Sequence, residues 1–356
     1  MSANDGVGSA LNLEGRATVL VTGGALAPEA TALLEEHAIR LHHAAPYSGP
    51  DEVARLAATQ QVDGIIHRTG RLTAEMIGAS PRLRVIAKHG SGVDNIDLAA
   101  ASERGIPVMR TLVANAQAVA EHTLALTLAL LKELFALDST VKAGNWPKSG
   151  YRGRDVAGSV LGIIGFGAIG QRVAALGGAL GMRVLVFDPF FPSGVDAAGA
   201  TRLDDLGLLL AEADVVSLHC PLTPATRHMI GAEELRRMKP TAFLVNAARG
   251  GLVDEAALEA ALREGRIAGA ALDTFETEPP AADNPLWTLP NVIVTPHIAG
   301  ASAGAVLNMG VQAARHIIDI LQGKDPDARS VANPQFRTAD AASAPPERTA
   351  APSSRS

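Results

Sequence analysis

The sequence predicts an α/β protein built from two doubly wound parallel-sheet domains, a larger one inserted into a smaller, flavodoxin-like one. Three observations predict this class. Short apolar strands alternate with helical segments from residue 17 to about 110, and again from 160 to 295. Such alternation is typical of parallel sheets covered by helices on both faces. A glycine-rich turn opens the second series, and 356 residues suit two domains of roughly 150 residues each.

The first series contains short apolar strands separated by amphipathic segments. The expected strands are 17–22, 39–43, 64–68, 83–88 and 107–110. The expected helices lie near 28–37, 50–60, 73–79 and 97–104. Pro28 and Pro50 suit first helical turns, where a missing N–H group costs nothing. Residues 1–16 are polar and lack a basic region followed by an apolar one, so we expect a flexible N-terminus and no signal peptide.

A leucine- and alanine-rich segment from residue 115 to about 143 predicts one long helix, followed by a polar loop over 144–158. The second series then supplies further buried strands. They are 160–164, 183–187, 215–218, 242–246, 268–272 and 292–295.

The glycine-rich turn follows the first strand of this series and precedes a helix. It contains Gly165, Gly167 and Gly170, and Asp188 ends the next strand. Gly165 allows a tight turn, Gly167 allows the backbone to approach a pyrophosphate, and Gly170 allows close packing of helix on strand. The positive end of the helix dipole would face the diphosphate. This pattern predicts a Rossmann domain, the alternative being a glycine-rich turn in another α/β protein.

Asp188 also favours NAD over NADP. A carboxylate accepts hydrogen bonds from both ribose hydroxyls and repels a 2′-phosphate. Pro189, Phe190 and Phe191 follow it, so no nearby basic residue offsets that repulsion.

A helix over about 304–322 follows the last strand, and we expect it to return to the first domain. The predicted substrate-binding domain is therefore discontinuous, with residues 17–114 and 298–330. The NAD-binding Rossmann domain spans 115–297. Residues 331–356 are rich in Ala, Ser, Pro and Thr towards the end and are expected to form a disordered tail.

The composition limits the classes of binding partner and the cellular compartment that we expect. The net charge of −6 is mild and no basic cluster stands out, which argues against nucleic acid or an anionic membrane as the partner. No uncharged run is suited to cross a bilayer. Cys220 is the only cysteine, so an intramolecular disulfide is impossible and a cytoplasmic location is expected. No metal-binding signature is visible.

Three ionisable residues follow strands of the second series or lie in the loops beyond them. They are Arg249, Glu278 and His297. Ligands of open α/β sheets bind beyond the carboxyl ends of the strands, so these side chains are placed to converge near the cofactor. Reduction of a carbonyl needs a hydride and a proton. Histidine can exchange the proton near neutral pH, a carboxylate can hold the imidazole, and arginine can bind a substrate carboxylate. Taken singly, a histidine or arginine in a loop is more often an ordinary polar residue.

Seven motifs together resemble the D-isomer-specific 2-hydroxyacid dehydrogenases, and most closely their D-3-phosphoglycerate dehydrogenase-like branch. The motifs are GSGVDNID (90–97), VAEHTLAL (119–126), GIIGFGAIG (162–170), HCPLTPATRHMI (219–230), NAARGGLVDE (246–255), ALDTFETEP (271–279) and NPLWTLPNVIVTPHIAG (284–300). The resemblance covers residues 17–330 approximately and implies an NAD-dependent oxidoreductase acting on CH–OH groups.

The resemblance implies roles for individual residues. His297 would be the acid/base, Glu278 rather than Glu276 its partner, and Arg249 the group that binds the keto acid. Cofactor contacts would come from Gly165, Gly167, Ala168, Ile169, Gly170, Asp188, Pro221 and Asp273, the last at the nicotinamide amide. Substrate contacts from the first domain would come from backbone groups of Ser91 and Gly92, and from Arg68 and Lys88. The family is usually dimeric, and the long helix from residue 115 would serve as hinge and interface.

The substrate stays open at this point. Arg68 and Lys88 would suit the phosphate of 3-phosphoglycerate, but the branch has Arg where this chain has Lys88, and a small residue where it has His89. The alternatives are a hydroxypyruvate or glyoxylate reductase, or, in another class, an NAD(H)-sensing binding protein without turnover.

Overall fold

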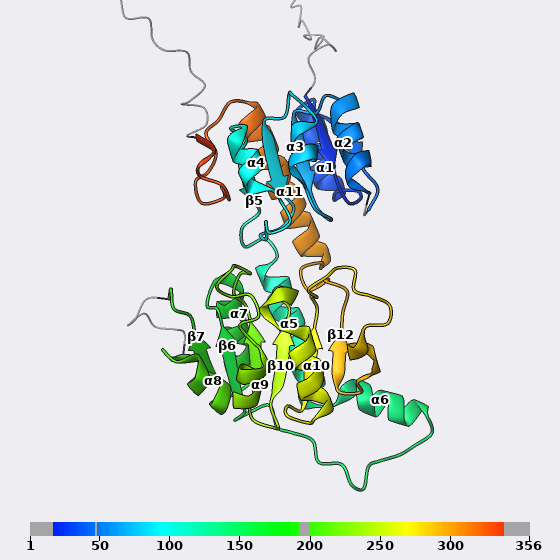
Figure 1. The fold of residues 1–356 in the computed structure, drawn as a ribbon, viewed down its shortest axis with the longest axis vertical. Coiled ribbons are helices and arrows are strands. Elements are labelled where there is room, and N and C mark those ends of the chain that lie inside the picture. Colours follow the sequence, from blue (N-terminus) through cyan, green and yellow to red (C-terminus); the bar gives the residue numbers. More distant parts are fainter. Residues whose placement is uncertain (1–16, 47, 192–198, 338–356) are drawn as a thin grey trace, which may run out of the picture. The chain divides into compact units, whose positions relative to one another are not determined.

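The computed structural model describes residues 17–46, 48–191 and 199–337, which form two compact α/β units (Figure 1). Unit 1 takes its described residues from Met1–Leu112 and Leu307–Ser356, and unit 2 is Val113–Val306. The boundaries thus fall at 113 and 307, where the sequence suggested 115 and 298. The expected flexible residues 1–16 lie outside the described part of the chain.

Unit 1 contains a five-stranded parallel sheet in the order β2-β1-β3-β4-β5. Its strands are β1 (Thr18–Val21), β2 (Arg40–His43), β3 (Gly64–His67), β4 (Val85–Lys88) and β5 (Val108–Arg110). The helices are α1 (Pro28–Glu36), α2 (Pro50–Thr59), α3 (Ala74–Gly78), α4 (Leu98–Glu103) and, from residue 307 onward, α11 (Ala303–Leu321). One hydrophobic core packs α1 and α11 on the sheet, and a second packs α2, α3 and α4 on the other face. This is the doubly wound arrangement that the sequence predicts.

The end of unit 1 corrects one expectation. The tail was expected to begin at residue 331, but residues 331–337 belong to the packed unit. Val331 and Phe336 are buried in the core with α1 and α11. Asn333 is fully buried, and its side chain accepts from the Val108 N–H group and donates to the Ile106 carbonyl. Val331, Asn333 and Phe336 attach this segment to unit 1, but they stand in a polar, proline-containing stretch, so their burial could not be predicted from the sequence. The remaining residues of the expected tail, 338–356, lie outside the described part.

Unit 2 contains, among the described residues, a seven-stranded parallel sheet in the order β12-β11-β10-β9-β6-β7-β8. The strands are β6 (Val160–Ile164), β7 (Arg183–Phe187), β8 (Thr201–Arg202), β9 (Val215–Leu218), β10 (Phe243–Asn246), β11 (Gly269–Leu272) and β12 (Val292–Val294). The two-residue strand β8 adds to the six strands that were predicted. Counted from β6, the order is that of a Rossmann domain with one strand more.

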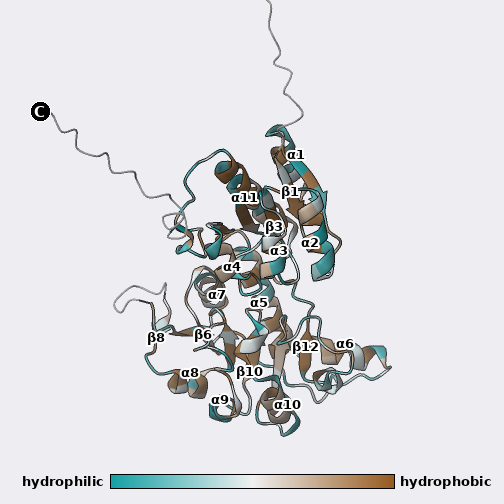
Figure 2. Cartoon of the chain, turned by 45° about the horizontal axis from the view of Figure 1, so that its top comes forward, coloured by the Kyte–Doolittle hydropathy of each residue, from teal (hydrophilic) through white to brown (hydrophobic). Residues whose placement is uncertain are grey.

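Helices cover both faces of this sheet. They are α5 (Ala116–Leu131), α7 (Ala168–Ala179), α8 (Leu206–Glu212), α9 (Ala232–Arg237) and α10 (Glu255–Arg263). One core contains α5 and α7, and the other contains α8, α9 and α10. The strands of both units are coloured mostly hydrophobic in Figure 2, as expected for strands buried on both faces.

The predicted helix over 115–143 is two helices. The helix α5 ends at Leu131, and α6 (Leu134–Lys142) begins after Glu133, which has a left-handed φ of 51°. The carbonyl of Lys132 accepts the Tyr151 hydroxyl, and the Lys132 ammonium donates to the Arg154 carbonyl, so loop contacts stabilise the break. All residues of α6, each of which the structure describes, are exposed or half-buried. The helix α6 stands out from the body of unit 2 (Figure 1).

Of the helices in the described part of the chain, none combines the length and the apolar character that a membrane span requires.

Candidate active site

Six strand ends of unit 2 carry the residues that the sequence singles out. Because the sheet is parallel, these carboxyl ends share one edge. They are Gly165 after β6, Asp188 after β7, Pro221 after β9, Arg249 after β10, Asp273 after β11 and His297 after β12.

The glycine-rich turn between β6 and α7 has the features of an anion-binding turn. Gly165 has φ +94°, and a Cβ atom there would lie 2.7 Å from the backbone of His219 and Cys220. A Cβ atom on Gly170 would lie 2.2 Å from the Gly165 carbonyl oxygen. A Cβ atom on Gly167, in contrast, meets no described atom within 4 Å. No described side chain caps the N-terminus of α7, and such an uncapped helix start can donate hydrogen bonds to a phosphate.

Asp188 is held beside this turn by backbone donors. Its Oδ2 accepts the Phe166 N–H group at 2.7 Å, and its Oδ1 accepts the Phe190 N–H group at 2.9 Å. A carboxylate offers about four acceptor sites. Two sites therefore remain for ribose hydroxyls, and the residues present fit a dinucleotide.

The other predicted cofactor residues border the same edge. Ala168 is the first residue of α7, and both Ala168 and Pro221 are exposed. Ile169 packs on a small apolar cluster that joins α5, the end of β10 and the turn after β12. The cluster consists of Val119, Ala247 and Ala299.

The structure pairs His297 with Glu278. The imidazole Nδ1 lies 2.7 Å from Glu278 Oε2, and the two side chains are 47% and 37% exposed. Burial raises the pKa of Glu278, but the hydrogen bonds and charges of its neighbours, with His297 foremost, together outweigh burial, so the pKa lies below its usual value. Glu278 Oε1 also accepts the Phe275 N–H group. The carboxylate is thus held in place, and Nε2 is the imidazole nitrogen left to face a substrate.

Arg249 lies close enough that its charge also lowers the pKa of Glu278. It precedes the short 3₁₀ turn η2 (Gly250–Leu252), and its Nη1 donates to the Ala248 carbonyl. A Cβ atom on Gly250 would lie 1.9 Å from the carbonyl carbon of Phe275. The loops bearing Arg249 and Glu278 are therefore in direct backbone contact, which glycine permits.

Asp273 organises the turn that carries His297. Its carboxylate is fully buried, accepting the Thr295 hydroxyl at 2.5 Å and the N–H groups of Ile298 and Ala299. Its carbonyl accepts the His297 N–H group at 2.8 Å. These bonds hold His297 at a left-handed φ of 54°. Sequence reasoning assigned Asp273 to the nicotinamide and missed this supporting role.

In unit 1, the two basic candidates bond to protein oxygens. Lys88 ends β4 and is 7% exposed, and its ammonium donates to the Arg68 carbonyl at 3.1 Å and to Asn95 Oδ1 at 3.3 Å. The Arg68 guanidinium donates to the Ala25 carbonyl, and burial lowers the pKa of Arg68. Both cations are thus engaged by oxygens of unit 1.

Ser91 and Gly92 lie half-buried in the loop between β4 and α4. This loop is tied to the loop after β3, since the Asn95 amide donates to the Gly70 carbonyl at 2.6 Å. The candidate substrate loops of unit 1 are therefore joined to each other.

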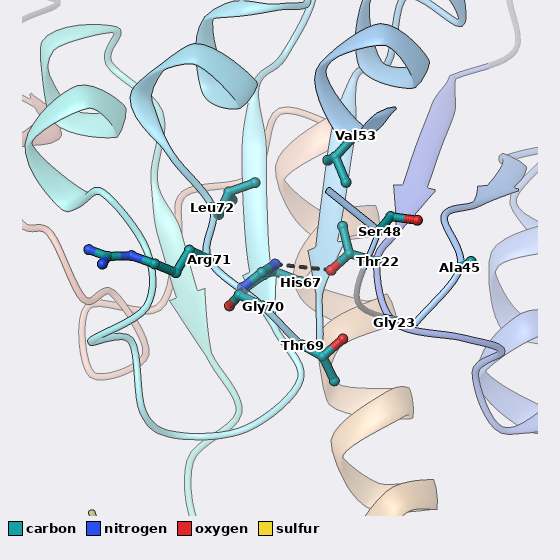
Figure 3. Close-up of a pocket in the computed structure, with 10 residues that line it drawn as sticks. All are labelled: Thr22, Gly23, Ala45, Ser48, Val53, His67, Thr69, Gly70, Arg71 and Leu72. Carbon is teal, nitrogen blue, oxygen red and sulfur yellow. Dashed lines mark hydrogen bonds between the residues drawn. The ribbon is translucent and has the colours of Figure 1, made fainter. Parts of the chain in front are cut away.

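A small cavity lies where β1 and β3 adjoin, which is the topological switch point of this sheet order (Figure 3). Its volume is about 20 Å³, room for one water and too little for a keto acid. His67 borders it. Its Nδ1 lies 3.0 Å from the Thr22 hydroxyl oxygen, and its Nε2 donates to the Gly70 carbonyl.

Unit 1 is expected to lose stability in mild acid because of His67. Burial lowers the pKa of His67 to about 3. The unfolded chain takes up this proton below about pH 6.5 and the folded chain only below about pH 3, so stability falls as the pH drops between these values. The loss at pH 5 is about 2 kcal/mol. Urea unfolding at pH 7 and pH 5 measures this loss. The free energy of unfolding should change less between the two pH values in His67→Gln than in the wild-type protein, and an equal change in both proteins would contradict the role of His67.

The chain is similar to known proteins in sequence and in fold. The profile of the D-isomer specific 2-hydroxyacid dehydrogenase NAD-binding domain matches residues 124–299. A D-3-phosphoglycerate dehydrogenase of Methanocaldococcus jannaschii is 42% identical over 271 residues, 76% of this chain and 52% of the relative. A hydroxypyruvate reductase of Thermotoga maritima is 40% identical over 255 residues, 71% of this chain and 82% of the relative. This chain thus spans about half the length of the phosphoglycerate dehydrogenases it matches.

Among solved structures, the TT0316 protein of Thermus thermophilus is similar in fold. Its TM-score is 0.81 at 36% identity, and the match covers 88% of this chain and 99% of that one.

Proposed function

Because this chain belongs to the D-isomer specific 2-hydroxyacid dehydrogenase family, we propose that it interconverts a small 2-keto acid and the matching D-2-hydroxy acid with NAD(H). The observation that supports the proposal is the His297–Glu278 pair with Arg249 beside it, at the same sheet edge as the glycine-rich turn.

The glycine-rich turn and Asp188 would hold NADH, which would supply the hydride for the substrate carbonyl carbon. His297 donates the proton from Nε2 to the carbonyl oxygen, because its Nδ1 is bonded to Glu278. The Glu278 carboxylate stabilises the protonated ring and sets its orientation. Arg249 binds the substrate carboxylate and favours the charge that develops on the carbonyl oxygen. In the oxidative direction His297 takes the hydroxyl proton back.

The position of Lys88 favours a substrate without a phosphate, such as hydroxypyruvate or glyoxylate. Two of the three N–H groups of its ammonium already donate to protein oxygens, and the residue is 7% exposed, so little of it is open to a phosphate. The Asp188 carboxylate favours NAD over NADP, because it would repel a 2′-phosphate.

The test is NADH oxidation with hydroxypyruvate, glyoxylate, pyruvate, 2-oxoglutarate and 3-phosphohydroxypyruvate. We expect turnover, with kcat/KM highest for an unphosphorylated acid. A preference for 3-phosphohydroxypyruvate would overturn the substrate assignment. Tight NADH binding without turnover of any acid would instead favour a sensor.

We also propose a homodimer formed through α6, in the cytoplasm, where the free thiol of Cys220 stays reduced. Leu134, Phe135 and Val141 of α6 are 53%, 59% and 44% exposed. Apolar side chains gathered on a projecting helix are typical of a protein interface.

The double substitution Leu134→Asp, Phe135→Asp is therefore expected to convert a dimer to a monomer, measured by light scattering after size-exclusion chromatography. Leu208→Asp, at a 54% exposed leucine of α8, is the control and should remain dimeric. An unchanged mass in the α6 variant would place the interface elsewhere.

A further inference from the structure

His228 contacts both loops that carry the proposed catalytic groups. Its backbone N–H group donates to the Gly251 carbonyl at 2.8 Å, two residues beyond Arg249. Its imidazole Nε2 bonds to the Glu276 carboxylate, two residues before Glu278. One residue therefore connects the two loops, through its backbone on one side and its side chain on the other.

The backbone of His228 is mildly strained. Its φ is 53°, in the left-handed region, which glycine adopts freely and other residues seldom do, although histidine does so more often than most. Such strain persists only where the surroundings hold it, and it is common at functional sites. The exposed fractions of the His228 and Glu276 side chains are 40% and 34%, so the ion pair itself adds little stability. The strain is therefore not explained by a gain in stability from this pair.

The loop before Glu278 is held at a second point. The Glu276 N–H group donates to Glu255 Oε1 at 2.6 Å, and Glu255 is the first residue of α10. Glu276 is thus fixed through its backbone by α10 and through its side chain by His228. The loop then presents Glu278, not Glu276, to His297.

We propose that His228 is a positioning residue for the reaction, which braces the Arg249 loop against the Glu278 loop and so orients the Glu278–His297 pair. This inference rests on the proposed function. The loop that carries Glu278 thus contributes a carboxylate to each of two His–Glu pairs, Glu278 to His297 and Glu276 to His228.

The decisive variant is His228→Gly, because glycine removes the side chain and also relieves the backbone strain. If His228 acts by positioning, kcat should fall roughly tenfold while KM for NADH stays within about twofold and the melting temperature does not decrease. His228→Gln, whose amide can still donate to Glu276, should recover most of kcat. The matched control is Ala38→Gly, at a residue of unit 1 with φ 57°, which relieves similar strain and should leave kcat unchanged.

Hydrogen exchange followed by mass spectrometry separates this inference from the proposed function. In His228→Gly the amides of residues 273–278 should exchange faster, and in Ala38→Gly they should not, whether or not a keto acid turns over. Unchanged hydrogen exchange in His228→Gly, or an unchanged kcat where the wild-type enzyme is active, would overturn the positioning role of His228. If the wild-type protein lacks turnover but the exchange difference is present, the proposed function fails, whereas the contact of His228 with both loops is supported.

Discussion

Replacement of His297 by alanine is expected to lower kcat about 10³-fold, because it removes the group that exchanges a proton with the substrate oxygen. The fold should tolerate the change, because the His297 side chain is 47% exposed and Asp273 holds the adjacent turn through the backbone N–H groups of Ile298 and Ala299. Steady-state NADH oxidation measures kcat, and NADH fluorescence measures cofactor binding, which should change little.

Two further variants check the assignment. His43→Ala, at an exposed histidine of β2 in unit 1, should behave like the wild-type protein. Glu278→Gln should reduce kcat less than His297→Ala, because the amide oxygen can still orient the imidazole but carries no charge. Retention of more than a tenth of the wild-type kcat in His297→Ala would contradict the assigned role.

Substitution of Gly165 by alanine is expected to destabilise unit 2 by about 3 kcal/mol or more. The φ of +94° is unfavourable for alanine, and the added methyl group would lie 2.7 Å from the backbone of the β9 end. Neither the turn nor the strand can yield without moving the sheet. Urea unfolding followed by circular dichroism measures the loss.

The contrasting variant is Gly167→Ala, two residues further along the same turn. Its methyl group meets no described atom within 4 Å, so stability should stay within about 1 kcal/mol. It would occupy the space assigned to the diphosphate, so the dissociation constant for NADH should rise about tenfold or more. An equal loss of stability in Gly165→Ala and Gly167→Ala would contradict the conformation of this turn.

The sequence was sufficient for the fold class, the family and the NAD-binding domain, because these depend on local patterns. Most strands in this protein are buried on both faces and bounded by glycine or polar residues, so their positions could be predicted closely. A residue at a strand end, such as Arg249, shares a sheet edge with the others once the sheet is parallel, and convergence follows from topology alone.

Features that depend on distant contacts could not be predicted in this way. The segment from residue 115 to 143 is helical in composition throughout, and the break at Glu133 depends on Tyr151 and Arg154 in a later loop. The pairing of His228 with Glu276 joins residues 48 positions apart. The bonds of the Lys88 ammonium to Asn95 Oδ1 and to the Arg68 carbonyl likewise join separate loops.

The discontinuity of unit 1 has a consequence for how the protein is made. Its core includes Ala313, Ile317 and Phe336, which follow the whole of unit 2 in the chain. During synthesis, unit 2 can emerge and fold as one continuous stretch while one face of the unit 1 sheet still lacks α11. Unit 2 is therefore complete before unit 1, and the N-terminal strands of unit 1 keep apolar surface exposed until α11 has been synthesised.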